Sequence, residues 1–193
     1  MPELFIGRLS ISTTFEDFVQ IVTIDESKAK AYVLVAVFAD SHFAPSLRKE
    51  LRAFLLRGQR SIHFSLENDS RRRKFLSLIS RHDLPMRVYV SNETNQATAR
   101  RWCLEMLLDD LPKEEQFKLV LDRDEAFVSF DQRIITNTSK VNNLNRGNIH
   151  GHDEPEYEPL LWIPDAIAWS YAKNGIWRTR VKELASIKIK KQA

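Results

Sequence analysis

This 193-residue sequence has little cysteine and little glycine, and each shortage excludes a class of protein. Its single cysteine, Cys103, cannot form an internal disulfide, and no CxxC motif indicates a zinc module. Five glycines provide no glycine-rich phosphate loop, which excludes nucleotide kinases and dinucleotide enzymes. A Ser-His-Asp pattern is also lacking, so nothing here predicts a serine hydrolase.

Long apolar runs are missing as well. None approaches the roughly 18–20 residues of a membrane span, and the first ten residues lack the basic and long apolar regions of a secretory signal. With 43% hydrophobic residues, the chain has enough apolar side chains for one domain. We therefore expect a cytoplasmic protein with no membrane partner, and the lone cysteine fits a reducing compartment.

The apolar pattern predicts an α/β fold with a mixed sheet covered on both sides. Apolar runs rich in β-branched or aromatic residues predict extended segments at 4–12, 18–25, 31–39, 61–64, 86–90 and 117–122. Apolar residues at three- and four-residue spacing predict helices at 45–57, 71–80, 95–111 and 159–175. Asp69 or Ser70 is the expected cap of the second helix, and Gly175 is expected to end the fourth. The polar stretch 136–158 predicts a long loop with at most a short strand.

Charge is distributed unevenly along the chain, although the net charge is only +3. Residues 40–101 hold 13 Lys/Arg against 6 Asp/Glu, whereas residues 102–165 hold 6 against 14. Residues 166–193 hold 7 against 1. This pattern favours a basic surface for an anionic polymer beside an acidic region for a metal ion, unless the blocks disperse in space.

Three aspartates stand where a carboxylate is costly. Asp25 and Asp122 each close an apolar run, and Asp165 lies inside the apolar stretch LLWIPDAIAW. Strand ends in α/β sheets are where ligand sites form, and carboxylates gathered there suit hard divalent ions such as Mg²⁺. If the three converge, phosphodiester cleavage is the predicted chemistry.

Each of these positions has a simpler interpretation. An aspartate after a strand often turns or caps the chain, which applies to Asp25 and Asp122. Asp124 lies two residues beyond Asp122 on an extended strand and could take its place as ligand. If Pro164 opens its helix, Asp165 is only a favourable charge at a helix N-terminus.

Four short motifs resemble one bacterial family. The segments TIDES, RSIHFS, LVLDR and IPDAIAW, spread over residues 18–173, resemble the domain of unknown function 3800 family, which is similar to the ribonuclease H-like superfamily. The resemblance implies a first strand ending in Asp25, a fourth strand ending in Asp122 and a late helix that presents Asp165. It also implies that Glu26 and His63 assist near the metal ions.

The chain departs from the family pattern at several points. Lys28 stands where the family has glycine, and Pro164 stands where it has alanine. The glutamate that the ribonuclease H pattern carries on or near its first helix has two candidates, Glu50 and Glu67. The resemblance implies a single ribonuclease H-like domain over residues 1–175, followed by a basic tail over 176–193.

Basic residues cluster around two of the predicted helices. Unless they form only a solvated face, we expect mostly phosphate contacts from six side chains: Arg48, Arg52, Arg71, Arg72, Arg73 and Lys74. The leading hypothesis is a Mg²⁺- or Mn²⁺-dependent nuclease with Asp25, Asp122 and Asp165 as ligands. The alternatives are an inactive nucleic-acid-binding or assembly protein of the same fold, and a protein-interaction domain with scattered carboxylates.

Overall fold

A β-hairpin forms the centre of the sheet in the computed structural model, which describes residues 20–145 and 147–189. Strands β1 (Gln20–Ser27) and β2 (Tyr32–Asp40) pair antiparallel through the short connection between them. The hairpin predicted from the two apolar runs is confirmed. The extended segment expected at 4–12 lies outside the described residues.

Four further strands extend this hairpin into a six-stranded mixed sheet of order β5-β4-β1-β2-β3-β6. On one side, β4 and β5 follow β1 in parallel, and on the other, β3 pairs antiparallel with β2 and parallel with β6. The added strands are β3 (Met86–Ser91), β4 (Phe117–Asp122), β5 (Ile149–Asp153) and β6 (Ser186–Ile189).

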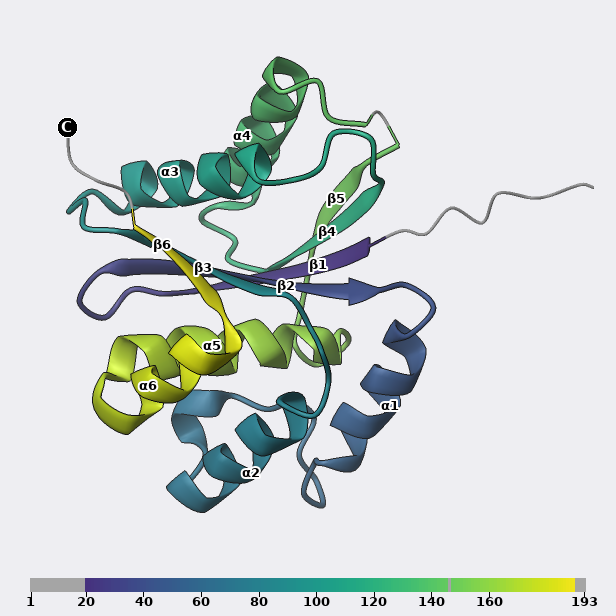
Figure 1. Ribbon diagram of the computed structural model, residues 1–193, viewed down its shortest axis with the longest axis vertical. Helices are drawn as coiled ribbons and strands as arrows, with labels where there is room; N and C mark the ends of the chain where they lie inside the picture. The colour runs from purple at the N-terminus through teal and green to yellow at the C-terminus, as the bar shows by residue number, and fades with distance from the viewer. Residues whose placement is uncertain (1–19, 146, 190–193) are drawn as a thin grey trace, which may run out of the picture.

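Helices cover both faces of the sheet, which confirms the predicted α/β class (Figure 1). One face carries α3 (Gln96–Asp109) and α4 (Val128–Val141). The other carries α1 (Ala44–Ala53), α2 (Asp69–Ile79), α5 (Trp162–Lys173) and α6 (Gly175–Leu184). Short 3-10 turns at Phe64–Leu66 and Pro159–Leu161 precede α2 and α5. None of the described helices is long and apolar enough to span a membrane.

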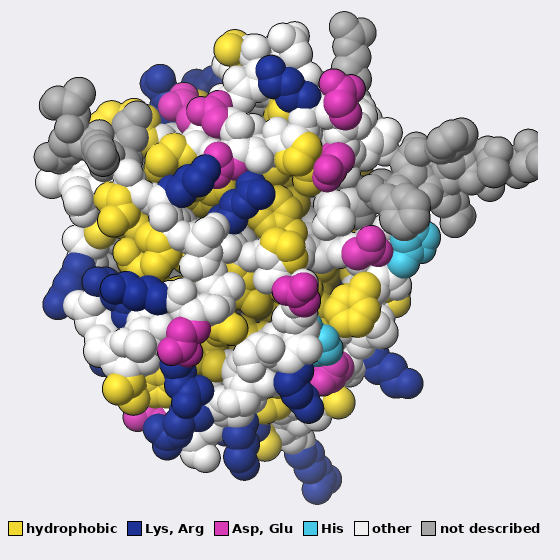
Figure 2. Space-filling view, in the orientation of Figure 1, with side chains coloured by type: hydrophobic (Ala, Val, Ile, Leu, Met, Phe, Trp, Pro, Cys, Tyr) yellow, Lys and Arg dark blue, Asp and Glu magenta, His cyan; other side chains and the backbone are white. Residues whose placement is uncertain are grey.

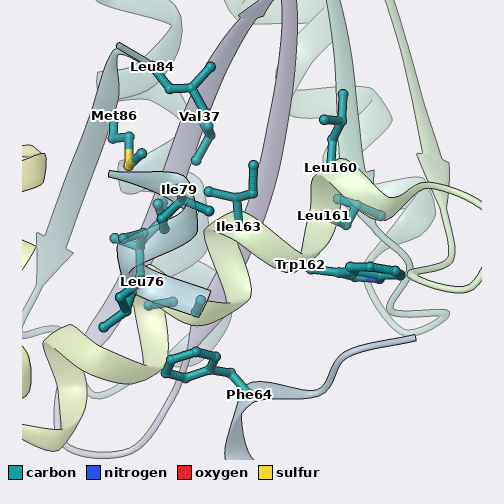
Figure 3. Packing of buried hydrophobic residues seen from close by; sticks show 14 of the residues in the cluster. Val37, Phe64, Leu76, Ile79, Leu84, Met86, Leu160, Leu161, Trp162 and Ile163 are labelled. Atoms are coloured by element: carbon teal, nitrogen blue, oxygen red, sulfur yellow. The ribbon is translucent and has the colours of Figure 1, made fainter. Parts of the chain in front are cut away.

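Strand β2 contributes side chains to two hydrophobic cores, because its side chains alternate between the two faces of the sheet. Val33, Val35 and Val37 pack beneath α5, and Leu34 and Ala36 pack beneath α3. Figure 3 shows the first core, where the start of α5 inserts apolar side chains against the sheet and α2. Burying one such side chain contributes about 1.5–3 kcal/mol, so the two cores fix the strand order and the register that position the site.

The segment 61–64 is not the short strand that its composition predicts. His63 is extended, but Phe64 begins a 3-10 turn and its N–H donates to the Asp165 carboxylate at 2.8 Å. The N–H of Phe64, which in a strand would bond to a neighbouring strand, therefore bonds to α5. The cap of α2 is also different, because Asn68 accepts the N–H of Arg71 in the role expected of Asp69 or Ser70.

Two stretches predicted as irregular are structured. Helix α4 overlaps the start of the polar stretch 136–158, and β5 is the one short strand allowed for within it. The predicted tail, 176–193, forms most of α6 and then β6 up to Ile189, so residue 175 is not a domain boundary. Asn174, with φ of 69°, separates α5 from α6, and Gly175, the first residue of α6, has φ of 59°. The positive φ at this junction redirects the chain into a second helix, where a simple termination was expected.

Candidate functional site

Parallel pairing of β1 and β4 places Asp25 beside Asp122. The last registered pair is Ile24 with Leu121, and each aspartate is the next residue of its strand. The aspartates follow the alternation of Ile21 and Val120, which belong to the core beneath α5. Both carboxylates therefore lie on the face of the sheet that α5 covers.

Asp165 reaches the same point from the first turn of α5. Pro164 precedes it inside the helix, which begins at Trp162. The 3-10 turn before α5 is tied to β1 by a hydrogen bond from the Thr23 hydroxyl to the Leu160 carbonyl, at 3.3 Å. Asp165 is thus both a first-turn acid and part of a shared pocket. The residues that line this pocket are Asp25, Glu26, Ser27, Lys28, Asp122, Arg123, Asp124, Glu125, Asp165 and Trp169.

Asp25, Asp122 and Asp165, here called the carboxylate triad, hold their protons unusually tightly. Burial raises the pKa of Asp25 well above its ordinary value, and the charges of Asp165, Asp122 and Glu26 raise it further. Burial and the charge of Glu26 raise the pKa of Asp122 to about 6. Burial also raises the pKa of Asp165, against the opposing hydrogen bond from Phe64 N–H. Three neighbouring acids whose charged forms are disfavoured in this way form a site that a cation would stabilise.

Each triad carboxylate accepts one backbone N–H. Asp25 accepts from Glu26 at 2.6 Å, Asp122 from Arg123 at 3.0 Å and Asp165 from Phe64 at 2.8 Å. Within the described residues the second oxygen of each has no hydrogen-bond donor. In the same part of the chain, no three His, Cys, Asp or Glu side chains are arranged to hold a metal ion. The oxygen donors suit a hard divalent ion, but the side chains must turn toward one another to bind it.

His63 lies close enough to act on the charges of two triad acids, and the role that the resemblance implies for it stays a prediction. It is exposed at the start of the turn that binds Asp165, and its Nε2 is 3.2 Å from the Ser61 hydroxyl. The positive charge of its imidazole ring opposes the rise in the pKa of both Asp122 and Asp165. This placement comes from the turn at Phe64 and does not depend on a strand.

Glu26 is held by two cations, which differs from its expected part in coordination. Its Oε2 lies 2.7 Å from Arg100 Nη1, and its Oε1 lies 3.1 Å from Lys28 Nζ. Arg100 is 1% exposed and also makes a two-point contact with Asp131, at 2.6 and 2.7 Å. Its Nη1 also donates a hydrogen bond to the Tyr32 hydroxyl oxygen at 2.9 Å. We call Glu26, Arg100, Asp131 and Tyr32 the Arg100 cluster.

Asp124, the alternative to Asp122, has a different environment. Its carboxylate accepts from Lys28 Nζ at 3.0 Å and from the N–H of Ala126 at 3.1 Å. The hydrogen bond from Lys28 lowers its pKa below the ordinary value. Asp124 is therefore a neutralised turn residue, and Asp122 is the better ligand of the two.

Several residues near the site were not predicted from the sequence. Asp153 ends β5 in register with Asp122, so a third strand-end carboxylate, after Asp25 and Asp122, lies on the neighbouring strand. His152, the preceding residue, donates from its Nε2 to the buried Asp131 carboxylate at 2.9 Å. Arg100 had a visible signal, because it falls at the three- and four-residue spacing of Cys103, Leu104 and other apolar positions of α3.

Two of the arginines expected to bind nucleic acid make contacts within the protein. Arg48 donates to both oxygens of Glu158, at 2.6 to 3.2 Å. Arg52 donates to the Tyr157 carbonyl at 3.3 Å. These side chains attach α1 to the segment before α5 and are poorly available to phosphate.

The basic start of α2 divides into two pairs. Arg71 contacts Glu67 at 2.5 Å, and Arg72 donates to the carbonyls of Phe64 and Ser65 at 2.9 and 2.8 Å. Arg73 and Lys74 are exposed, with no acidic partner among the described residues. Figure 2 shows basic side chains dispersed among acidic and apolar ones on this face, without one continuous patch.

Neither candidate for the missing glutamate lies in the pocket. Glu67 binds Arg71 and Gln59, and Glu50 lies 3.0 Å from Arg81. The pocket therefore takes its acids from β1, from β4 and the turn after it, and from α5.

Comparison with known structures agrees with this architecture. An RNase HII from Archaeoglobus fulgidus, solved in a PCNA:RNase HII complex, superimposes with a TM-score of 0.56 at 16% identity, over 86% of this chain and 78% of that one. Bst-RNase HIII in complex with Mn²⁺ matches with a TM-score of 0.49 at 16% identity, over 78% of this chain and 51% of that one. No protein-family model and no curated protein matches the sequence, so the family named above stays a prediction. At these identities the likeness concerns the fold alone: the chain has a ribonuclease H-like α/β fold.

Proposed function

We propose that this protein is a divalent-metal-dependent nuclease that hydrolyses phosphodiester bonds. The observation that carries the proposal is the carboxylate triad, in which burial raises the pKa of all three acids and neighbouring negative charges raise those of Asp25 and Asp122 further. A buried negative charge without a partner is costly, and a divalent cation would remove that cost. The fold supports the same conclusion only in outline, since it resembles that of an RNase HII.

Asp25, Asp122 and Asp165 would hold Mg²⁺ or Mn²⁺ through the oxygens that their backbone hydrogen bonds leave open. The bound ion would supply positive charge that polarises the phosphodiester and activates the attacking water. His63, exposed beside the triad, would accept or deliver a proton during the reaction. Arg73 and Lys74 would contact the backbone phosphates of the nucleic acid, and Glu26 would take no direct part.

A cleavage screen tests the proposal. Single- and double-stranded DNA and RNA and a hybrid duplex are each incubated with Mg²⁺, Mn²⁺ or a chelator. We expect cleavage that requires the metal and falls at least 100-fold in Asp25→Asn. Glu125→Gln is the matched control, because this acid lines the same pocket but is paired with Arg123 at 2.6 Å outside the triad. Cleavage that survives the chelator, or that both variants lose equally, would contradict the triad as the metal site.

A nucleic-acid-binding protein without nuclease activity is the second candidate. It is favoured by the neutralisation of Glu26 by Arg100 and Lys28, which removes one acid from the pocket. This candidate predicts binding that weakens steeply with salt and no cleavage with either metal. The same preparations, tested for binding at several salt concentrations, distinguish the two.

A further inference from the structure

Two protonated side chains enter the acidic pocket from opposite sides and meet at Glu26. Arg100 reaches it from α3 and takes Oε2 at 2.7 Å. Lys28 reaches it from the turn after β1 and takes Oε1 at 3.1 Å. Both oxygens of this carboxylate therefore carry a cation that belongs to the chain itself.

Arg100 cannot leave this position readily. Its side chain is 1% exposed, it makes a two-point contact with the fully buried Asp131, and its guanidinium lies 5.0 Å from the centre of the Phe127 ring. Moving it would leave the buried Asp131 with His152 as its remaining side-chain partner, which is unfavourable. The positive charge on this side of Glu26 is a fixed part of the fold.

Lys28 is more exposed but is held at three points. Besides Glu26, its ammonium contacts Asp124 Oδ2 at 3.0 Å and lies 5.4 Å from the centre of the Phe127 ring. It stands between two carboxylates that line the pocket, which is the position that a bound cation would take. Lys28 and Arg100 therefore neutralise one half of the pocket. Arg123, the basic residue next to Asp122 in the lining, pairs with Glu125, and among the described residues no ion pair reaches the triad.

We infer that the pocket binds one divalent ion, on Asp25, Asp122 and Asp165, and that Lys28 occupies the place on Glu26 and Asp124 where a second would bind. This inference rests on the proposed function, because it assigns the first ion to the triad. A second ion would have to displace the Lys28 ammonium group from both Glu26 and Asp124. The pocket thus replaces one metal ion with an internal ammonium group.

The test counts bound ions and does not depend on activity. Mn²⁺ alone is titrated into the metal-free protein, and its stoichiometry is measured by calorimetry and by the loss of the free-Mn²⁺ signal in electron paramagnetic resonance. We expect one ion per chain in the wild type and in Lys28→Arg, and two in Lys28→Met. Lys30→Met, which removes a neighbouring lysine of the same turn, is the control for a change in net charge and should bind one.

The outcomes separate the two proposals. Two ions in the wild type, or a single ion in Lys28→Met, would overturn the role of Lys28 while leaving the triad as a metal site. No Mn²⁺ bound by any variant, with each variant folded by circular dichroism, would instead reject the proposed function. A second ion in Lys30→Met would show that net charge alone sets the stoichiometry, and would also overturn the inference.

Discussion

The pocket has two halves, which differ in how their acids are neutralised. One contains Asp25 and the other contains Glu26, although these two residues are adjacent in β1. Asp25 joins the triad, where each carboxylate has backbone N–H donors but no basic side chain within ion-pair distance among the described residues. Glu26, the next residue, is bound by Arg100 and Lys28. In the first half the pKa of Asp25 is raised, whereas in the second half the pKa of Asp124 is lowered. The contrast teaches that the neighbouring elements, more than the strand end itself, decide which acid can serve a metal.

Strand alternation produces this division. Asp25 follows the side of β1 that faces α5, and Glu26 follows the side that faces α3 and α4. Helix α3 supplies Arg100 on its buried face, whereas α5 supplies another carboxylate, Asp165. One face of the sheet therefore concentrates negative charge and the other neutralises it.

The largest difference in stability that tests this comparison is expected at Arg100. We expect Arg100→Met to lower the free energy of unfolding by about 3–5 kcal/mol, because Asp131 and Glu26 lose a buried counter-charge. Urea denaturation measures this change. The control is Arg101→Met, which removes an exposed arginine paired with Glu105 and should cost less than about 1 kcal/mol. An equal decrease in the free energy of unfolding in the two variants would show that the Arg100 cluster stabilises the fold no more than an exposed ion pair does.

The next effect is the pH dependence of stability in the metal-free protein. A carboxyl group whose pKa is raised on folding stabilises the protein fully below its unfolded pKa, and this contribution is lost as pH rises through the folded value. For Asp122 this loss falls between its ordinary pKa of 3.8 and the raised value of about 6. At about 1.4 kcal/mol per pKa unit, the expected loss is on the order of 3 kcal/mol.

Asp122→Asn should remove this part of the pH dependence. Unfolding free energies of both proteins are measured in chelator at pH 4 and pH 7.5. We expect the variant to gain stability relative to the wild type at the higher pH, since it carries no charge there. A wild type that becomes more stable relative to the variant over this range would show that Asp122 is already neutralised.

The smallest effect concerns Lys28. Its side chain is 39% exposed, so its ion pairs are screened by solvent. We expect Lys28→Met to change stability by no more than about 1 kcal/mol, far less than Arg100→Met. A loss as large as that of Arg100→Met would mean that both cations of Glu26 are structural, and thermal denaturation in chelator is sufficient to decide.

The sequence predicted the parts of the fold whose signals are local. Strands β1 to β4 follow from apolar runs, and α1, α2, α3 and α5 follow from apolar spacing. Helix α4 was not predicted because its buried residues are few, Asp131 and Ile135, and much of its remaining surface is polar. Strand β6 is short and contains two polar residues, and it is defined by its pairing with β3, which no local pattern contains.

The candidate site divides in the same way. The placement of Asp25, Asp122 and Asp165 could be predicted, since each interrupts or ends an apolar run. The neutralisation of Glu26 could not, because Arg100 is 74 residues away and Lys28 reaches back across a turn. The internal contacts of Arg48 and Arg72 were also hidden, since a basic cluster in sequence does not reveal which carbonyls and acids lie within reach.

The most direct test of the central claim compares the two halves of the pocket by metal-dependent stabilisation. The thermal midpoint is measured with and without Mn²⁺ for the wild type, Asp25→Asn and Glu26→Gln. If the triad alone holds the ion, Mn²⁺ raises the midpoint of the wild type and of Glu26→Gln and leaves that of Asp25→Asn unchanged. Stabilisation that persists in Asp25→Asn but disappears in Glu26→Gln would contradict the account.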